Sequence, residues 1–189
     1  IAATLAFASA AVTNALTVAQ AKALGNNAAN VTIGPVTIST TNDLNGSGYT
    51  FPAQDASGGV LLYGPGTTLS SLIPAYGLTP GSIVTFNGTG TWYYGMYELG
   101  YVTVVTNEGA GAVPAPIDID AQDLQNGAPT GKICQSMLVR ITGVVFRDQG
   151  QSFVSPGTYS IYKYGLTNTV RLQDAADPLN GTTIPTGTC

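Results

Sequence analysis

Residues 49–63 read YTFPAQDASGGVLLY, a pattern typical of two β-strands joined by a tight turn. We place the turn at Gly58 and Gly59, because glycine adopts a positive φ at little steric cost. The β-branched and aromatic residues on both sides favour extended structure. The stretch therefore predicts a β-hairpin.

The same order of elements occurs twice along the chain. A strand pattern at residues 31–38 precedes the first hairpin, and a similar pattern at 138–146 precedes a second hairpin that turns at Gly165. The offset of about 110 residues is the size of a small domain. The aligned pairs are Val36 with Val144, Tyr49 with Tyr159, and Leu62 with Leu172.

Composition predicts an all-β protein with an uncharged surface. The 189 residues include 24 Gly, 11 Pro and 10 Tyr, while charged residues make up only 8% and the net charge is −4. A neutral, hydroxyl-rich surface lacks the repulsion that keeps copies apart, which favours self-association. No Lys or Arg lies between Lys22 and Lys132, so binding to nucleic acid is disfavoured.

Further elements follow from local patterns. Apolar spacing predicts helices at 16–24 and 67–76, and strands are expected at 31–38, with an interruption at Gly34-Pro35, and at 81–90 and 99–106. A Gly/Pro/Ala-rich stretch separates two halves. We therefore expect an apolar extension at 1–15, a first domain at 16–107, a linker at 108–116 and a second domain at 117–189.

The helix at 16–24, followed by VTIGPVTI (31–38), QDASGGVLLY (54–63) and LTPGSIVTFNGTG (78–90), resembles the OB-fold domains of secreted bacterial nucleases and cell-surface proteins. The resemblance covers residues 16–106, and residues 140–174 resemble the opening half of a second such domain. It implies two OB-like β-barrels with short helices. We expect the second barrel to be incomplete, because few residues follow Leu172 to supply its later strands.

The uncharged segment at 1–15 has two interpretations. The piece ending at Ala10 resembles the end of an export signal, whereas a retained apolar extension would need burial against another surface. It is too short and too rich in Ala and Thr for a membrane span. An arm of this kind could complete the open second barrel of a neighbouring copy, which gives a filament when the contact does not close into a ring. The apolar residues of this assembly arm are Ile1, Leu5, Phe7 and Val12.

Cys134 and Cys189 are the two cysteines of the chain. A disulfide between them would tie the carboxyl-terminal tail to the second domain and indicate an extracellular or cell-surface location. The alternative is two unrelated thiols. A zinc site is not expected from two cysteines and no histidine.

Aromatic residues between positions 92 and 101 offer a candidate binding surface. They would stack against bases or sugar rings, or else pack into the core and an interface. Sugar binding needs no positive charge, so a glycan remains open as a partner. The residues are Trp92, Tyr93, Tyr94, Tyr97 and Tyr101.

Two further groups of residues have competing interpretations. The aspartates could contribute to a calcium site, but they lack calcium-loop spacing and commonly cap backbone N–H groups. The Asn-X-Ser/Thr sequences are glycosylation acceptors or simply turns. These residues are Asp118, Asp120, Asp123, Asp174 and Asp177, and Asn30, Asn45, Asn87 and Asn180.

The sequence offers no catalytic constellation. There is no His, no phosphate-cradling loop and no nucleophile motif, and nothing in the sequence brings the two glutamates, Glu98 and Glu108, together. We expect no enzymatic activity, no cofactor and no metal. The sequence predicts an exported structural protein that forms a homo-polymer; the alternative is a monomeric OB-type module that binds glycan or single-stranded nucleic acid.

Overall fold

The computed structural model describes residues 15–41, 50–64, 68–125, 134–172 and 179–189. Within these ranges strands predominate, which confirms the all-β prediction. The helices there are α1 (Val18–Ala23), α2 (Thr68–Tyr76) and the 3-10 helix η1 (Ala121–Leu124). Neither α-helix in the described ranges has the length and apolar run needed to cross a bilayer.

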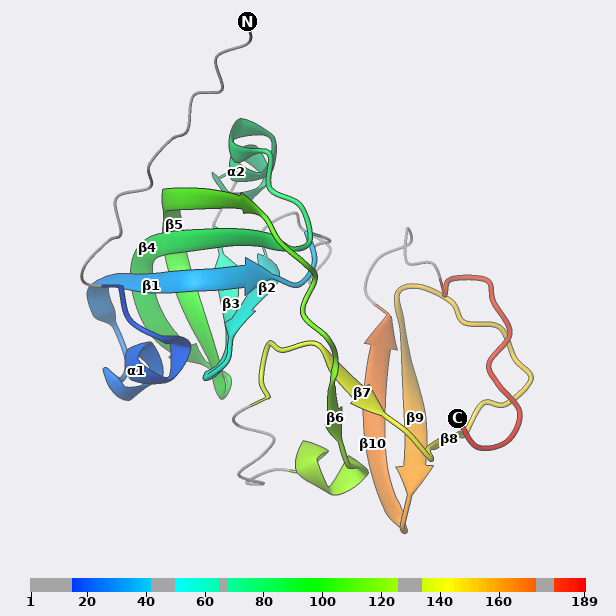
Figure 1. The fold of residues 1–189 in the computed structure, drawn as a ribbon. Coiled ribbons are helices and arrows are strands. Elements are labelled where there is room, and N and C mark those ends of the chain that lie inside the picture. The colour runs from blue at the N-terminus through cyan, green and yellow to red at the C-terminus, as the bar shows by residue number, and fades with distance from the viewer. Residues whose placement is uncertain (1–14, 42–49, 65–67, 126–133, 173–178) are drawn as a thin grey trace, which may run out of the picture.

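The first half of the chain forms a closed five-stranded barrel (Figure 1). Neighbours follow the order β1-β2-β3-β5-β4, and β1 closes the barrel against β4. All neighbouring pairs are antiparallel except β3 and β5, which run parallel. A closed five-stranded barrel is the OB-like architecture that we expected. Its strands are β1 (Ala28–Ile38), β2 (Thr50–Asp55), β3 (Gly58–Tyr63), β4 (Ser82–Tyr93) and β5 (Met96–Ala110).

The two α-helices lie at opposite ends of the barrel (Figure 1). Val18 and Ala21 of α1 and Leu69 of α2 are fully buried in the barrel core. The start of α1 is fixed by Thr17, whose hydroxyl accepts from the Gln20 N–H while the Gln20 side chain accepts from the Thr17 N–H. The predicted helices at 16–24 and 67–76 are therefore present.

The predicted hairpin is present as β2 and β3, but its turn lies two residues earlier in the sequence than predicted. Asp55 pairs with Gly58, so Ala56 and Ser57 form the turn. Oδ1 of Asp55 accepts from the N–H groups of Ser57 and Gly58 at 2.7 and 3.1 Å, which holds the turn without glycine. Gly58 and Gly59 instead begin β3.

Two other departures from regular strands affect the predicted boundaries. The register of β1 against β4 shifts between Ile33 and Val36, which is the interruption expected at Gly34-Pro35. Strand β5 continues to Ala110, past the predicted domain end at residue 107. The N–H of Gly111 then donates to the carbonyl of Gly81 at 2.8 Å, so the start of the predicted linker belongs to the barrel.

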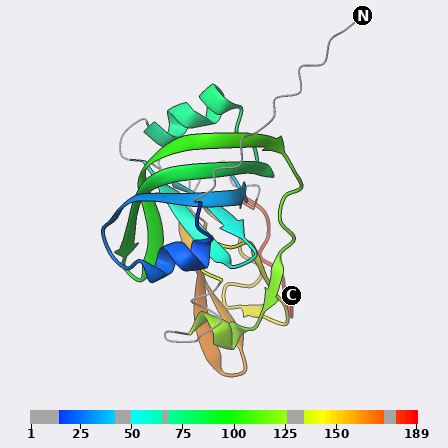
Figure 2. The ribbon, with the colours of Figure 1, turned by 60° about the vertical axis from the view of Figure 1, so that its left-hand side comes forward.

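The second half contains two smaller sheets beside the barrel (Figure 2). In the described residues they form no closed barrel, and an incomplete second OB-like barrel stays a prediction. The order β8-β9-β10 repeats that of β1-β2-β3, and the second hairpin turns at Tyr164 and Gly165, as predicted. The strands are β6 (Ile117–Ile119) paired with β7 (Val139–Ile141), and β8 (Val145–Phe146), β9 (Gly157–Lys163) and β10 (Leu166–Leu172).

Polar side-chain contacts join the two halves. Oε1 of Gln54, a buried residue of β2, accepts from the Ser39 hydroxyl at 3.0 Å and from the Leu138 N–H at 2.8 Å. Nε2 of Gln135 donates to the Gly95 carbonyl at 2.7 Å. Gly59 faces the backbone of residues 135–136 so closely that a side chain would collide with it. The segment 134–138 therefore lies directly against β2, β3 and the turn at Gly95.

The predicted disulfide is not formed, since Cys134 and Cys189 are both free thiols. The reason is where each cysteine lies. Cys134 belongs to the segment against the barrel, whereas the N–H of Cys189 donates to the Val144 carbonyl at 2.9 Å and its carbonyl accepts from Gly143. The tail is thus held by backbone hydrogen bonds at β8. The assembly arm (Ile1, Leu5, Phe7, Val12) and the residues Asn45, Tyr49, Asp174 and Asp177 lie outside the described residues.

Candidate functional site

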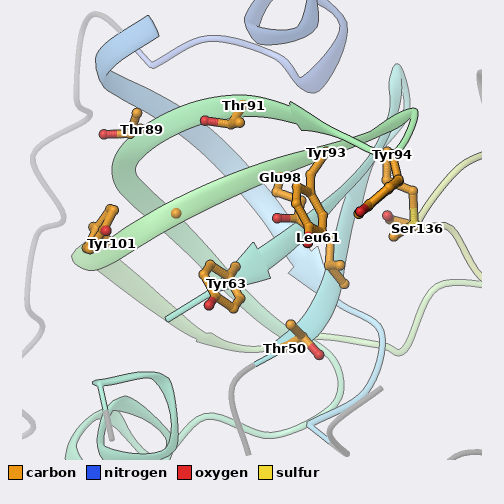
Figure 3. A pocket seen from close by; sticks show the side chains of 12 residues that line it. Thr50, Leu61, Tyr63, Thr89, Thr91, Tyr93, Tyr94, Glu98, Tyr101 and Ser136 are labelled. Atoms are coloured by element: carbon orange, nitrogen blue, oxygen red, sulfur yellow. The ribbon is translucent and has the colours of Figure 1, made fainter. Parts of the chain in front are cut away.

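A groove of about 810 Å³ crosses the outer face of the barrel (Figure 3). It runs over β4, β5 and β3, reaches Thr50 in β2, and is bordered at one end by Ser136 of the second half. Its lining residues are Thr50, Leu61, Tyr63, Thr89, Thr91, Tyr93, Tyr94, Met96, Glu98, Gly100, Tyr101 and Ser136. We call this feature the tyrosine groove.

Strand alternation explains which side chains reach the groove. Tyr97 and Leu99 point into the core and are fully buried, so their neighbours Met96, Glu98 and Gly100 point outward. The neighbouring strands β4 and β3 add the residues that pair with Glu98 and Gly100. Thr91, Glu98 and Leu61 form one row across β4, β5 and β3, and the next row along is Thr89, Gly100 and Tyr63.

Gly100 leaves the middle of the groove open. A Cβ atom placed there would meet only Thr89 O at 3.8 Å and Tyr63 Cδ1 at 3.9 Å, which are ordinary contact distances. A larger side chain at position 100 would therefore extend into the groove without disturbing the barrel backbone.

Two tyrosines of the groove sit in left-handed backbone. Tyr94 (φ 46°) and Gly95 (φ 83°) form the two-residue turn between β4 and β5, and Tyr101 (φ 53°) follows Gly100 at a bulge opposite β4. A bulky residue with positive φ is strained, and glycine or asparagine would fit these positions better. Both side chains are nevertheless exposed, Tyr94 by 91% and Tyr101 by 71%, so burial does not offset the strain.

The aromatic walls have a defined geometry. Tyr93 and Tyr94 meet edge to face, with ring centroids 4.5 Å apart and planes at 77°. Figure 3 shows Tyr101 at the end of the groove opposite Tyr94 and Ser136, with Tyr63 between them. Aromatic faces are thus distributed along the length of the groove.

The predicted aromatic surface is only partly realised. Tyr93, Tyr94 and Tyr101 line the groove, whereas Tyr97 belongs to the core and donates its hydroxyl to the Ala21 carbonyl at 2.9 Å. Burial raises the pKa of Tyr97. Trp92 does not line the groove, and its ring packs edge to face on Tyr97 at 5.3 Å.

Apart from Tyr93, Tyr94 and Tyr101, sequence reasoning named none of the lining residues of the groove as binding candidates. Tyr63 lies far away in sequence and reaches the groove only through the parallel pairing of β3 with β5. Met96 and Glu98 could have been found, because alternation from a buried Tyr97 places both on the outer face.

Glu98 is the only Asp, Glu, Lys or Arg among the lining residues. It is half-buried, and no hydrogen bond or ion pair joins its carboxylate to any side chain in the described ranges. Burial raises its pKa above the usual 4.5. The groove therefore carries a single, partly desolvated carboxylate beside neutral hydroxyl and aromatic groups.

The candidate calcium ligands are used elsewhere. Asp118 pairs with Arg140 at 2.6 Å, Asp120 pairs with Lys163 at 3.0 Å, and Asp123 accepts from the Asp120 N–H. Both ion pairs lower the pKa of the aspartate. No group of three potential metal-ligating side chains occurs in the described part of the chain.

The described sequon asparagines occupy different settings. Asn30 lies in β1 with φ 56° and is exposed, Asn87 donates to the Thr32 hydroxyl at 2.9 Å, and Asn180 accepts from the Ser155 N–H at 2.9 Å. None of the three lines the tyrosine groove.

The fold and the groove together define an OB-like barrel that presents an aromatic surface with one carboxylate and no cationic side chain. Comparisons with protein-family models, curated proteins and solved structures found no match to this chain.

Proposed function

We propose that this protein is a non-enzymatic binding module that holds a glycan in the tyrosine groove. The observation that carries the proposal is the pair of exposed tyrosines, Tyr94 and Tyr101, at left-handed positions. Backbone strain that packing does not offset is found preferentially at functional sites. Both side chains border the same groove, where tyrosine rings can stack on sugar rings.

The remaining lining residues support a sugar over a nucleic acid. Thr89, Thr91 and Ser136 bring hydroxyl groups that can donate to and accept from sugar hydroxyls. No Lys or Arg lines the groove, and Glu98 would repel a phosphate backbone. Of the two ligands considered from the sequence, a glycan suits this chemistry better.

The proposal is tested by titrating neutral oligosaccharides into the full chain and following the fluorescence of Trp92, the only tryptophan. Gly100→Val should weaken binding strongly, because its side chain projects into the groove between Thr89 and Tyr63. Thr103→Val, on the exposed face of β5 outside the groove, is the matched control and should bind like wild type. Equal binding by wild type and Gly100→Val would refute the site.

Titration with a thymidine oligonucleotide distinguishes glycan binding from the alternative, binding of single-stranded nucleic acid. We expect no binding at physiological salt. Binding that is strong at low salt, falls steeply as salt is raised and is lost in Gly100→Val would favour the nucleic acid instead.

We also propose self-assembly into an extracellular homo-polymer as a second candidate function. It is supported by the second-half sheet, in which β10 pairs with β9 on one side and with no other strand among the described residues. Such an edge is a template for a strand from another copy. The low charge of the chain is favourable to this packing.

Electron microscopy of the full chain and of a variant lacking residues 1–13 tests this second function. Filaments formed by the full chain and lost in the variant are expected. Small uniform particles from both proteins would leave the glycan-binding module as the function.

A further inference from the structure

We propose that the tyrosine groove selects glycans that carry a free, protonated amino group, and that Glu98 is the residue that recognises it. This inference rests on the proposed glycan-binding function and adds the charge of the ligand.

The first step is the position of Glu98. It lies beside Thr91 on β4 and Leu61 on β3, in the row next to that of Gly100. A carboxylate at a half-buried site is stabilised when a cation or hydrogen-bond donors satisfy it. In the described residues no such partner is present, so the carboxylate is available to a ligand.

The second step is the surroundings of Glu98. The other titratable groups lining the groove are the phenols of Tyr63, Tyr93, Tyr94 and Tyr101, and no cationic side chain lines it. Tyrosine faces attract cations through the ring quadrupole. The perpendicular rings of Tyr93 and Tyr94 form a corner. A cationic group in the groove is thus favoured both by the carboxylate and by the rings.

The third step is the inference that the cationic group belongs to a sugar. Hydroxyl groups of Thr89, Thr91 and Ser136 accompany the rings, and the groove extends over several residues of β5 rather than forming a closed cage. A pyranose offers an apolar ring face, hydroxyls and, in amino sugars, an ammonium group. This combination matches the groove better than an isolated ammonium ion.

The test compares a glucosamine hexamer with an N-acetylglucosamine hexamer, because acetylation removes the charge and keeps the sugar chain. We expect the glucosamine hexamer to bind about tenfold more tightly to the full chain at mildly acidic pH, the gain typical of a charge-assisted hydrogen bond. Equal affinities would overturn the selectivity while leaving the glycan-binding function intact. Binding of neither hexamer, nor of other oligosaccharides, would overturn both.

Two variants make the test specific. Glu98→Gln should bind both hexamers equally and keep the affinity for the acetylated one. Glu108→Gln changes the net charge by the same amount at an exposed position outside the groove and should retain the preference. A preference that survives in Glu98→Gln, or is lost in Glu108→Gln, would overturn the assignment. Tighter binding of a lysine hexapeptide than of the glucosamine hexamer would overturn the choice of a sugar.

Discussion

The hydroxyl of Tyr97 links the barrel to α1. The Tyr97 ring lies against Gly90, where any side chain would collide with the phenol. The Tyr97 hydroxyl donates to the Ala21 carbonyl of α1 at 2.9 Å. Tyr97→Phe should lower the free energy of unfolding by about 1 kcal/mol, because the Ala21 carbonyl loses one of its two donors and keeps only the Leu24 N–H. Urea unfolding measures the loss, with Tyr93→Phe as the exposed control. An unchanged midpoint for Tyr97→Phe would contradict the role of this bond.

The backbone at Tyr101 gives a second prediction. Tyr101→Gly removes the left-handed strain but adds chain entropy to the unfolded state, so stability should change by less than about 1 kcal/mol. Ligand binding should fall, because one wall of the groove is lost. By contrast, Leu99→Ala in the adjacent core should cost about 2–5 kcal/mol. A large loss of stability in Tyr101→Gly would show that this tyrosine is structural.

Glu98 predicts a pH dependence of stability. Because burial raises its pKa in the folded state, the native protein binds the proton more tightly than the unfolded chain does. The contribution of Glu98 is therefore most favourable below pH 4.5 and is lost as the pH rises through the folded-state pKa. Glu98→Gln should match wild type in acid and exceed its stability at neutral pH. Thermal unfolding of both proteins at several pH values checks this. A Glu98→Gln variant less stable than wild type at neutral pH would show that the ionised carboxylate stabilises the fold, contrary to the prediction.

At the scale of elements, local patterns were sufficient for most of the barrel. Apolar spacing identified both α-helices, and the Gly165 turn was found correctly. The turn of the first hairpin was misplaced because glycine was assumed to supply a positive φ, whereas hydrogen bonds to the Asp55 side chain hold the turn at Ala56 and Ser57. The groove could not be assembled from sequence, since β3 meets β5 through a long-range parallel pairing.

The contact of β3 with the second half gives a prediction about this element. Gly59→Ala would collide with the backbone of residues 135–136, so the segment 134–138 should move away from the barrel. The half-buried thiol of Cys134 should then react faster with a thiol reagent, measured in a Cys189→Ser background because Cys189 is exposed. Gly100→Ala, which has room for its methyl group, is the control. Unaltered labelling in Gly59→Ala would contradict this packing.

At the scale of the molecule, the two halves differ in the size of their cores. The barrel buries a large cluster that includes Ile33, Phe51 and Phe86, whereas the described second-half cluster consists of Phe153, Tyr159 and Ile184 with Phe146 packed against it. Amides of β9 and β10 should therefore exchange with deuterium at lower opening free energies than those of β1 and β4. Uniform protection across both halves would mean that the chain unfolds as one unit.

The dual role of Gln54 has a practical consequence for anyone dividing the chain. Expressing the barrel alone removes Leu138, so Oε1 of Gln54 keeps only the Ser39 hydroxyl as a donor, and it uncovers the surface at Gly59 against which residues 135–136 pack. The excised fragment would also lack Ser136 and present a truncated ligand surface. A minimal domain for crystallisation should therefore retain residues through 138, or carry a redesigned surface around position 54.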